Sequence, residues 1–397
     1  MKVSTSRRSF LQAAAASPLI FSSGSWVVHG SSSDQRAAVT FGFNVPQTGA
    51  YSAEGGDELR AFLLAVEHLN GEGDGGLLQT MQPLHLQGNG VLGRRVKYVV
   101  GDTRTDPKHA VAYARHMMAI DGVSMVSGGV SSSVAIAMQQ LAQKMGVIFM
   151  TGITHSNDTT GKDRRRYGFR HFLNAQMSGA ALGPVLAKQL GSERSVYHLT
   201  ADYTWGWTQE ATIRETTEKL GWRTLKAVRT PIGTTDFSRF IEPIAASGAD
   251  TVVLNHYGKD LVHSIRQLTE TGLRDCLVNG NPFEVVVPLY SSLMAQGAGD
   301  AIKGVLGTTN WHWSLEDQGS KTFVNSYITR YGTPPSQAAH TCYVQTLLYA
   351  NAVEMAGTFY PPEVIRQLEG LQFSGMGNGE VLYRAEDHQC IKSVQVV

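Results

Sequence analysis

Three consecutive serines occupy the place in this chain where the residue types most clearly suggest chemistry. Ser131, Ser132 and Ser133 lie in GGVSSSVAIAMQQLAQKMGVIFM, residues 128–150, between two glycines and an apolar pattern of helical period, so a helix should begin there. Hydroxyls at that place could form a nucleophile site, cradle a phosphate, cap the helix or hold an anionic ligand. The unpaired amide hydrogens of a helix N-terminus carry about half a positive charge, which stabilises an anion and is compatible with a cap.

A catalytic serine would have a different sequence context. A nucleophile elbow reads Gly-x-Ser-x-Gly, with an acid and a histidine later in the chain, whereas SGGVSSSVA lacks the second glycine. His312 has no cysteine or histidine partners at zinc spacing. The glycines of NGEGDGG, residues 70–76, follow a helical pattern and precede a strand, the reverse of a dinucleotide site. We expect no catalytic residue, no metal, no cofactor and no enzymatic activity.

The rest of the chain alternates between short β-branched runs and longer helical patterns. AVTFGFNV at residues 38–45 predicts a strand, and GDELRAFLLAVEHLN at residues 56–70 predicts a helix. The alternation resumes after a polar, basic stretch at residues 154–168. We therefore predict an α/β fold with two Rossmann-like lobes built on parallel sheets, which bind ligands beyond the carboxyl ends of their strands.

Composition and the N-terminus narrow the class of protein. A formal net charge of +1 leaves no electrostatic footprint for nucleic acid. SRRSFLQAAAASPLIF places a pair of arginines before a short apolar stretch, which resembles a twin-arginine export signal over residues 1–36 and predicts a periplasmic protein. Cys276, Cys342 and Cys390 allow at most one intrachain disulfide, and buried thiols are the favoured interpretation.

Four segments in order carry a family resemblance: FGFNVPQTGAYSAEGGDELRAFLLAVEHLN, LGRRVKYVVGDTRTDPKHAVAYARHM, the serine stretch, and YRAEDHQCIKSVQVV. They resemble the periplasmic solute-binding proteins of ABC transporters, of the branched-chain amino acid (LIV-binding, type I) family. The resemblance implies two lobes that are joined by three crossovers and close on a ligand in the cleft. It places lobe 1 at residues 37–157 and about 282–355, and lobe 2 with the hinge crossovers at residues 158–281 and about 356–397.

The same resemblance implies a set of ligand contacts. The serine loop would bind the α-carboxylate, Gly152 and Thr154 would offer a carbonyl and a hydroxyl, and an aromatic ring would cover the ligand. The expected contacts are Tyr51, Ser131, Ser132, Ser133, Gly152, Thr154, Tyr203, Trp205, Asp260 and Phe283. Asp260 would meet a ligand ammonium unless it only caps the following helix, and Glu284 is the alternative acid. Without an acid in the cleft, the ligand would be neutral or a carboxylate.

The function that follows is capture of a small molecule rather than catalysis. We expect an exported, monomeric binding protein that delivers a small amino acid or related carboxylate, with an aromatic one included, to an inner-membrane ABC permease. One alternative is a periplasmic sensor that reports the ligand to a signalling partner. Another is an exported enzyme, which the twin-arginine pattern favours slightly.

Overall fold

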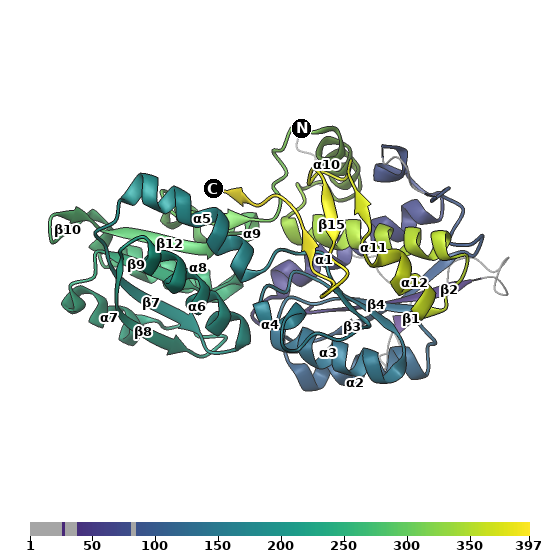
Figure 1. Cartoon of the computed structure of the whole chain (residues 1–397), viewed down its shortest axis with the longest axis horizontal. Helices are drawn as coiled ribbons and strands as arrows, with labels where there is room; N and C mark the ends of the chain where they lie inside the picture. The colour runs from purple at the N-terminus through teal and green to yellow at the C-terminus, as the bar shows by residue number, and fades with distance from the viewer. Residues whose placement is uncertain (1–25, 28–37, 81–84) are drawn as a thin grey trace, which may run out of the picture.

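The computed structural model describes residues 26–27, 38–80 and 85–397, and these residues form two α/β lobes that lie side by side (Figure 1). Each lobe has one six-stranded sheet with helices on its faces. The predicted fold class is therefore confirmed. The expected export signal at residues 1–36 falls outside the described residues, except for a two-residue strand, β1 (Trp26–Val27).

The sheet of lobe 1 has the strand order β1-β3-β2-β4-β5-β6. Its strands after β1 are β2 (Val39–Val45), β3 (Val96–Asp102), β4 (Met125–Gly128), β5 (Ile148–Thr151) and β6 (Gly168–Arg170). All of these pair in parallel, and only β1 runs antiparallel to its neighbour. The carboxyl ends of the parallel strands therefore meet at one edge, which is where this class of sheet places ligands.

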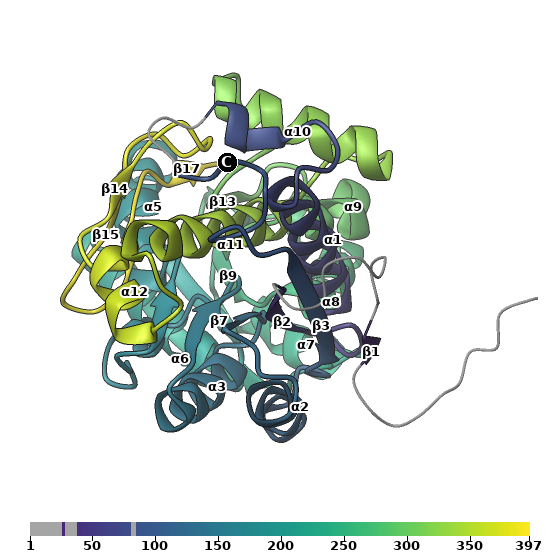
Figure 2. The same cartoon turned by 90° about the vertical axis from the view of Figure 1, so that its right-hand side faces the viewer.

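Helices cover both faces of this sheet because its strands are apolar on both sides. Phe41 and Phe43 of β2 pack towards α1 and α11, and Gly42 between them lies against Met117 of α2. Figure 2 looks onto this lobe, with α1 and α11 on one side of the strands and α2 and α3 on the other. The helices of lobe 1 are α1 (Ser52–Leu69), α2 (Pro107–Ala119), α3 (Ser132–Met145), α4 (Asn157–Thr160), α10 (Gln318–Tyr331), α11 (Gln337–Ala356), α12 (Pro361–Leu368) and the 3-10 turn η1 (Gly76–Gln79).

Lobe 2 repeats the design with the strand order β17-β13-β12-β9-β7-β8. Its strands are β7 (Ser195–Ala201), β8 (Arg223–Thr230), β9 (Thr251–Asn255), β12 (Glu284–Leu289), β13 (Leu306–Thr309) and the antiparallel β17 (Gln395–Val396). Its helices are α5 (Ala175–Leu190), α6 (Thr204–Lys219), α7 (Ser238–Ser247), α8 (Gly258–Glu270), α9 (Ser292–Ala298) and the 3-10 turns η2 (Leu273–Asp275) and η3 (Gly299–Ile302).

Two small antiparallel sheets complete the described chain. One is the hairpin β10 (Leu277–Val278) and β11 (Asn281–Pro282) at the far end of lobe 2. The other consists of β14 (Gln372–Phe373), β15 (Val381–Tyr383) and β16 (Cys390–Ile391), and its residues Val381, Tyr383 and Cys390 are part of the lobe 1 core. After this sheet the chain returns to lobe 2, where β17 pairs with β13.

The lobe boundaries differ from the expected ones. Strand β12 pairs with β9, and β13 pairs with β12, in the lobe 2 sheet, so residues 282–309 do not belong to lobe 1. Strand β6 pairs with β5, which keeps residues 158–170 in lobe 1, and α12 with the β14–β16 sheet also packs there. The chain consequently crosses between the lobes after β6, after β13 and between β16 and β17. Three crossovers were expected, but sheet pairing places them elsewhere.

Two further features of the described chain bear on the expectations. No helix within residues 26–27, 38–80 and 85–397 is long and apolar enough to cross a membrane. No disulfide joins the three cysteines; Cys342 and Cys390 are buried as expected, whereas Cys276 is exposed. The expectation of buried thiols is therefore wrong for Cys276, because it follows a 3-10 turn near the edge of lobe 2 rather than entering a core strand.

Candidate ligand-binding site

The carboxyl ends of the two sheets supply side chains that meet at the seam between the lobes. Three of them follow strands of lobe 1 and three follow strands of lobe 2, and all six pack in one buried cluster. They are Tyr51, Val130 and Ile153 from lobe 1, and Tyr203, Trp205 and Tyr257 from lobe 2. The seam therefore brings together the predicted ligand residues Tyr51, Tyr203 and Trp205, which are distant in sequence.

Aromatic rings form the larger part of this seam. The hydroxyls of Tyr51 and Tyr203 share a hydrogen bond of 2.9 Å across the lobes. Trp205 has its ring centroid 5.9 Å from that of Tyr203 and 6.1 Å from that of Tyr257, and Tyr257 lies 6.0 Å from Tyr51. Burial raises the pKa of Tyr51 well above its ordinary value, and the adjacent Tyr203 adds to this. Both hydroxyls are thus neutral, and the bridge is an ordinary hydrogen bond between phenols.

The serine loop lies beside this cluster, since Val130 belongs to it. Gly128 and Gly129 have φ values of 108° and 105°, a backbone that favours glycine, which explains the paired glycines before the serines. The N-cap residue of α3, Ser131, makes no side-chain cap bond, and its Oγ lies 2.9 Å from Oγ of Ser133. The simple capping role is therefore absent, and these two hydroxyls bond only to each other among the described residues.

Ser132 has a different role from its neighbours. Its Oγ accepts the backbone N–H groups of His155 and Ser156, at 3.2 Å and 3.0 Å. The hydroxyl oxygen is consequently occupied by the protein, and Ser132 holds the start of α3 against the loop that follows β5. Ser131 and Ser133 are the better placed members of the triplet for an external anion.

Glu58 of α1 links the serine loop to the Gly152 turn. This buried carboxyl group accepts the N–H of Gly129 at 3.1 Å and that of Ile153 at 3.2 Å. Burial raises its pKa to about 8, although the two N–H groups oppose the change. Gly152 leaves room for this contact, because a Cβ there would lie 2.1 Å from Oε1 of Glu58. Gly152 is therefore required by the packing of the site, whether or not it touches a ligand.

Two threonine hydroxyls near this turn have no hydrogen-bond partner among the residues that the structure describes. They are Oγ1 of Thr151, at the carboxyl end of β5, and Oγ1 of Thr154, and both are fully buried. Buried hydroxyls are usually paired, so these two are candidates for a ligand contact. Thr154 was an expected site residue, and its contact with a ligand stays a prediction.

His155, which the sequence did not indicate, connects the two lobes at the seam. Its ring Nδ1 accepts the indole N–H of Trp205 at 2.8 Å, and its Nε2 lies 2.9 Å from Oγ of Ser178 on α5. Because the indole nitrogen can only donate, Nδ1 carries no proton and Nε2 is the donor to Ser178. Burial lowers the pKa of His155 well below its ordinary value, and the charge of Arg170 lowers it further. The ring is neutral and fixes Trp205 over the seam.

The acids expected to meet an ammonium are placed differently. Both oxygens of Asp260 accept the N–H of Gly233, at 3.0 Å and 3.1 Å, so this carboxyl group holds a loop of its own lobe. It lies in the first turn of α8 rather than at the N-cap, which is Tyr257. Burial raises its pKa to about 7.

Phe283 and Glu284 do not reach the seam. Glu284 is the first residue of β12, and Phe283 precedes it and donates its N–H to the carbonyl of Cys276 at 3.1 Å. They therefore lie at the amino ends of the lobe 2 strands, opposite to the edge that faces lobe 1. Strand β12 begins at Glu284, so these two residues lie at the start of a strand rather than after its end.

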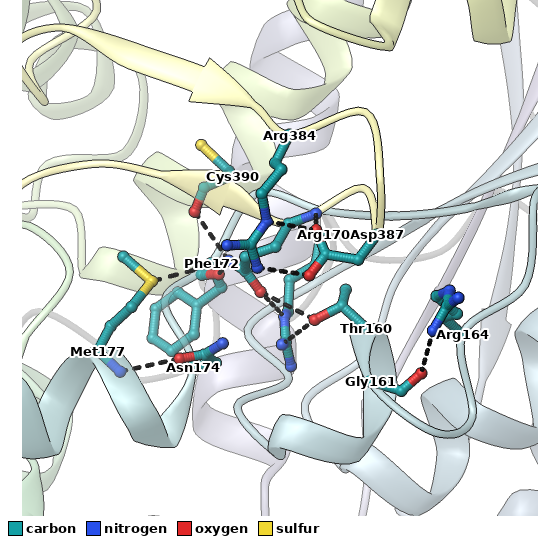
Figure 3. Close-up of polar contacts among 11 residues, drawn as sticks. Thr160, Gly161, Arg164, Arg170, Phe172, Asn174, Met177, Arg384, Asp387 and Cys390 are labelled. Atoms are coloured by element: carbon teal, nitrogen blue, oxygen red, sulfur yellow. Dashed lines mark hydrogen bonds and ion pairs between the residues drawn. The ribbon is translucent and has the colours of Figure 1, made fainter.

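The hinge side of the site is held by a buried guanidinium (Figure 3). Arg170, at the end of β6, donates to the carbonyls of Thr154 and Ser156 and to Oε1 of Gln389, the last at 2.7 Å. Gln389 in turn donates to the carbonyl of Phe172 at 2.8 Å. Burial lowers the pKa of Arg170 to about 9. Gln389, near the C-terminus, therefore connects the loop after β5, through Arg170, to the crossover that follows β6.

Two lobes with parallel sheets and a seam at their carboxyl ends define the type I periplasmic binding protein fold. The sequence profile of the periplasmic binding protein family matches residues 38–397, and the chain belongs to this family. One relative is the leucine-, isoleucine-, valine-, threonine- and alanine-binding protein of Pseudomonas aeruginosa, 25% identical over 329 residues that cover 83% of this chain and 81% of the relative.

Solved structures agree with this fold. A periplasmic binding protein from Burkholderia mallei has a TM-score of 0.79 at 22% identity and covers 91% of this chain and 89% of its own. A solute-binding protein of an ABC transporter from Rhodopseudomonas palustris, in complex with 3,4-dihydroxybenzoic acid, has a TM-score of 0.76 at 19% identity and covers 91% and 92%. At these identities the likeness establishes the fold.

Proposed function

We propose that this chain is an exported solute-binding protein that captures a small amino acid or related carboxylate between its lobes and presents it to an inner-membrane ABC permease. The observation that carries the proposal is the seam itself, where the serine loop of lobe 1 adjoins the aromatic cluster shared by both lobes. The relatives support the two ligand classes, since the Pseudomonas protein binds leucine, isoleucine, valine, threonine and alanine, and the Rhodopseudomonas protein holds 3,4-dihydroxybenzoic acid. Export through the twin-arginine route and action as a monomer are parts of the proposal.

The mechanism is a shift in population between open and closed lobes. A ligand that contacts both lobes stabilises the closed state by as much as it binds that state more tightly than the open one. The Tyr51–Tyr203 bridge and the Trp205–His155 contact are available only when the lobes meet, since each pair has one member in each lobe. The permease would then recognise the closed surface.

The proposal is tested by measuring heat of binding and thermal stability with a panel of amino acids and aromatic acids. A ligand at a hundredfold excess over its Kd should stabilise the fold by about 2.7 kcal/mol. The double variant Ser131→Ala/Ser133→Ala should lose most of that stabilisation for any carboxylate ligand, while Ser238→Ala on the exposed start of α7 should keep it. Binding by no member of the panel, or an undiminished effect in the double variant, would contradict the proposed site.

A further inference from the structure

The first two turns of α1 carry three buried acids, and only two of them have their oxygens satisfied. Asp57 accepts from Arg60 at 2.7 Å and from the N–H of Ser336 at 2.8 Å. Glu58 accepts the two backbone N–H groups of the serine loop and the Gly152 turn. Glu54, with 1% of its surface exposed, has an Oε2 that is buried and meets no donor among the described residues. Glu54 is therefore the exception that needs a reason.

Helix capping does not supply that reason. An acid in the first turn of a helix is favoured by the helix dipole, but an exposed carboxylate gains the same benefit without losing its water. A buried oxygen without a donor destabilises the fold, and such groups are rare in native proteins. A carboxyl group retained in this state points to a partner that arrives from outside the chain.

Glu54 lies at the seam because it is in the first turn of α1, three residues after the N-cap residue Tyr51. The ring of Tyr51 packs against that of Tyr257 in lobe 2, with the centroids 6.0 Å apart. Burial raises the pKa of Glu54 to about 7, and the nearby charge of Asp57 also raises it. The backbone N–H of Glu54 and the ammonium of Lys259 in lobe 2 lower it. Across the seam, burial raises the pKa of Tyr257 well above its ordinary value, and the Glu54 carboxylate raises it further. Lys259 is not an ion-pair partner, because its exposed ammonium contacts the carbonyl of Gly49 at 3.5 Å.

The aromatic cluster beside Glu54 has the form that suits a cation. The planes of Tyr51 and Tyr257 meet at 66°, those of Trp205 and Tyr257 at 73°, and those of Tyr203 and Trp205 at 49°. Rings set at such angles present faces and hydroxyls from several directions instead of stacking in one slot. Aromatic faces attract ammonium groups, most strongly where water is excluded.

We infer that Glu54, backed by these rings, selects ligands that carry an ammonium group, primary or methylated. The inference rests on the proposed function and assigns to Glu54 the role that the sequence suggested for Asp260. Asp260 has both oxygens engaged by Gly233, so it has less to offer a ligand. With the hydroxyls of Ser131 and Ser133 holding the carboxylate, the ligand would be a zwitterion rather than a plain aromatic acid.

The experiment compares probes that differ only in the ammonium group. L-leucine, L-phenylalanine and glycine betaine form one set, and their counterparts 4-methylpentanoate, 3-phenylpropanoate and 3,3-dimethylbutanoate form the other. Calorimetry on the wild type should show at least tenfold tighter binding of an ammonium probe than of its counterpart without nitrogen. A response to betaine but not to leucine or phenylalanine would identify a methylated ammonium as the preferred form.

Glu54→Gln keeps the shape of the side chain and removes its charge. It should weaken binding of the ammonium probe by about tenfold or more, as expected for loss of a charge-assisted contact. The affinity for the probes without nitrogen should not change. The melting temperature of the variant should be no lower than that of the wild type, because an unpaired carboxylate has been removed. Glu67→Gln, in the same helix but paired with Arg330, is the matched control and should bind as the wild type does.

The outcomes separate the two claims. If the wild type binds only the probes without nitrogen, or if Glu54→Gln binds leucine, phenylalanine and betaine as the wild type does, the role of Glu54 is overturned and the proposed function stands. If Asp260→Asn, and not Glu54→Gln, shows the selective loss, the ammonium belongs to Asp260. If no probe of either set binds, the proposed function fails and the role of Glu54 fails with it.

Discussion

Gly152 offers the sharpest test of how the site is built, because adding one methyl group there should separate Glu58 from the serine loop. The residue is buried and does not have a positive φ, so alanine could adopt its backbone without strain. A Cβ at Gly152 would nevertheless lie 2.1 Å from Oε1 of Glu58 and 2.4 Å from the carbonyl oxygen of Gly129. Neither neighbour is a flexible end in open solvent, so the carboxyl group and the serine loop would have to separate.

The magnitude follows from the bonds that this separation breaks. Glu58 accepts one N–H from each side of the contact, at 3.1 Å and 3.2 Å, and both donors are buried. Leaving a buried donor or acceptor unpaired costs about 1–3 kcal/mol. Loss of both bonds therefore destabilises the protein by about 2–6 kcal/mol. Ligand binding should fall as well, since the loop that carries Ser131 and Ser133 is no longer held.

The assay is urea unfolding of the Gly152→Ala variant, monitored by tryptophan fluorescence. The control is Gly56→Ala in α1, where a Cβ would meet only the end of Arg60 at 3.8 Å. Alanine in place of glycine inside a helix is favourable by about 0.5–1 kcal/mol, so the control should be neutral or slightly stabilised. A Gly152→Ala protein within about 1 kcal/mol of the wild type would show that Glu58 moves freely and does not fix the loop.

Two other substitutions test the hinge and the seam. Trp205→Phe keeps a ring but removes the indole N–H, which leaves Nδ1 of His155 without its donor. The free energy of unfolding, measured by thermal unfolding at neutral pH, should fall by about 1–3 kcal/mol. A loss smaller than about 0.5 kcal/mol would contradict the neutral tautomer assigned to His155. Lys392→Met should stabilise the protein, since Nζ of Lys392 is buried and has no partner within the described chain. Burial lowers the pKa of Lys392 to about 8, so the unfolded chain binds more protons between that pH and its ordinary pKa, and wild-type stability should rise with pH over this window. The variant should lack that rise, and a variant less stable than the wild type at pH 7 would refute the account.

The sequence predicted the architecture well because the architecture depends on periodicity. Apolar runs of strand length alternate with helical patterns, and the strands formed from them pair in parallel in both sheets, apart from the two-residue edge strands β1 and β17. The serine loop was located by its glycines and by the helix that follows, and the structure places it where a strand and a helix meet. These features are local, so they can be recognised from neighbouring residues alone.

The lobe boundaries and the acids could not be predicted in the same way, since they depend on pairing between distant residues. The apolar pattern of strand β12 would suit either sheet, and only its pairing with β9 assigns it to lobe 2. Asp260 and Glu54 both lie in the first turn of a helix. Nothing in the sequence shows that the N–H of Gly233, 27 residues earlier in the chain, satisfies Asp260, while Glu54 has no such partner for Oε2 in the described structure.

The division of groups between the lobes explains why closure and selectivity belong together. Lobe 1 contributes the serine hydroxyls, the unpaired oxygens of Thr151 and Thr154, and the carboxylate of Glu54. Lobe 2 contributes most of the rings, and Trp205 among them is fixed by a residue of the opposite lobe. In an open molecule the polar groups would keep their water, and closing the rings over them without a ligand costs free energy. A ligand that pairs with those groups removes this cost, so the closed state becomes stable in proportion to how completely the polar groups of lobe 1 are satisfied.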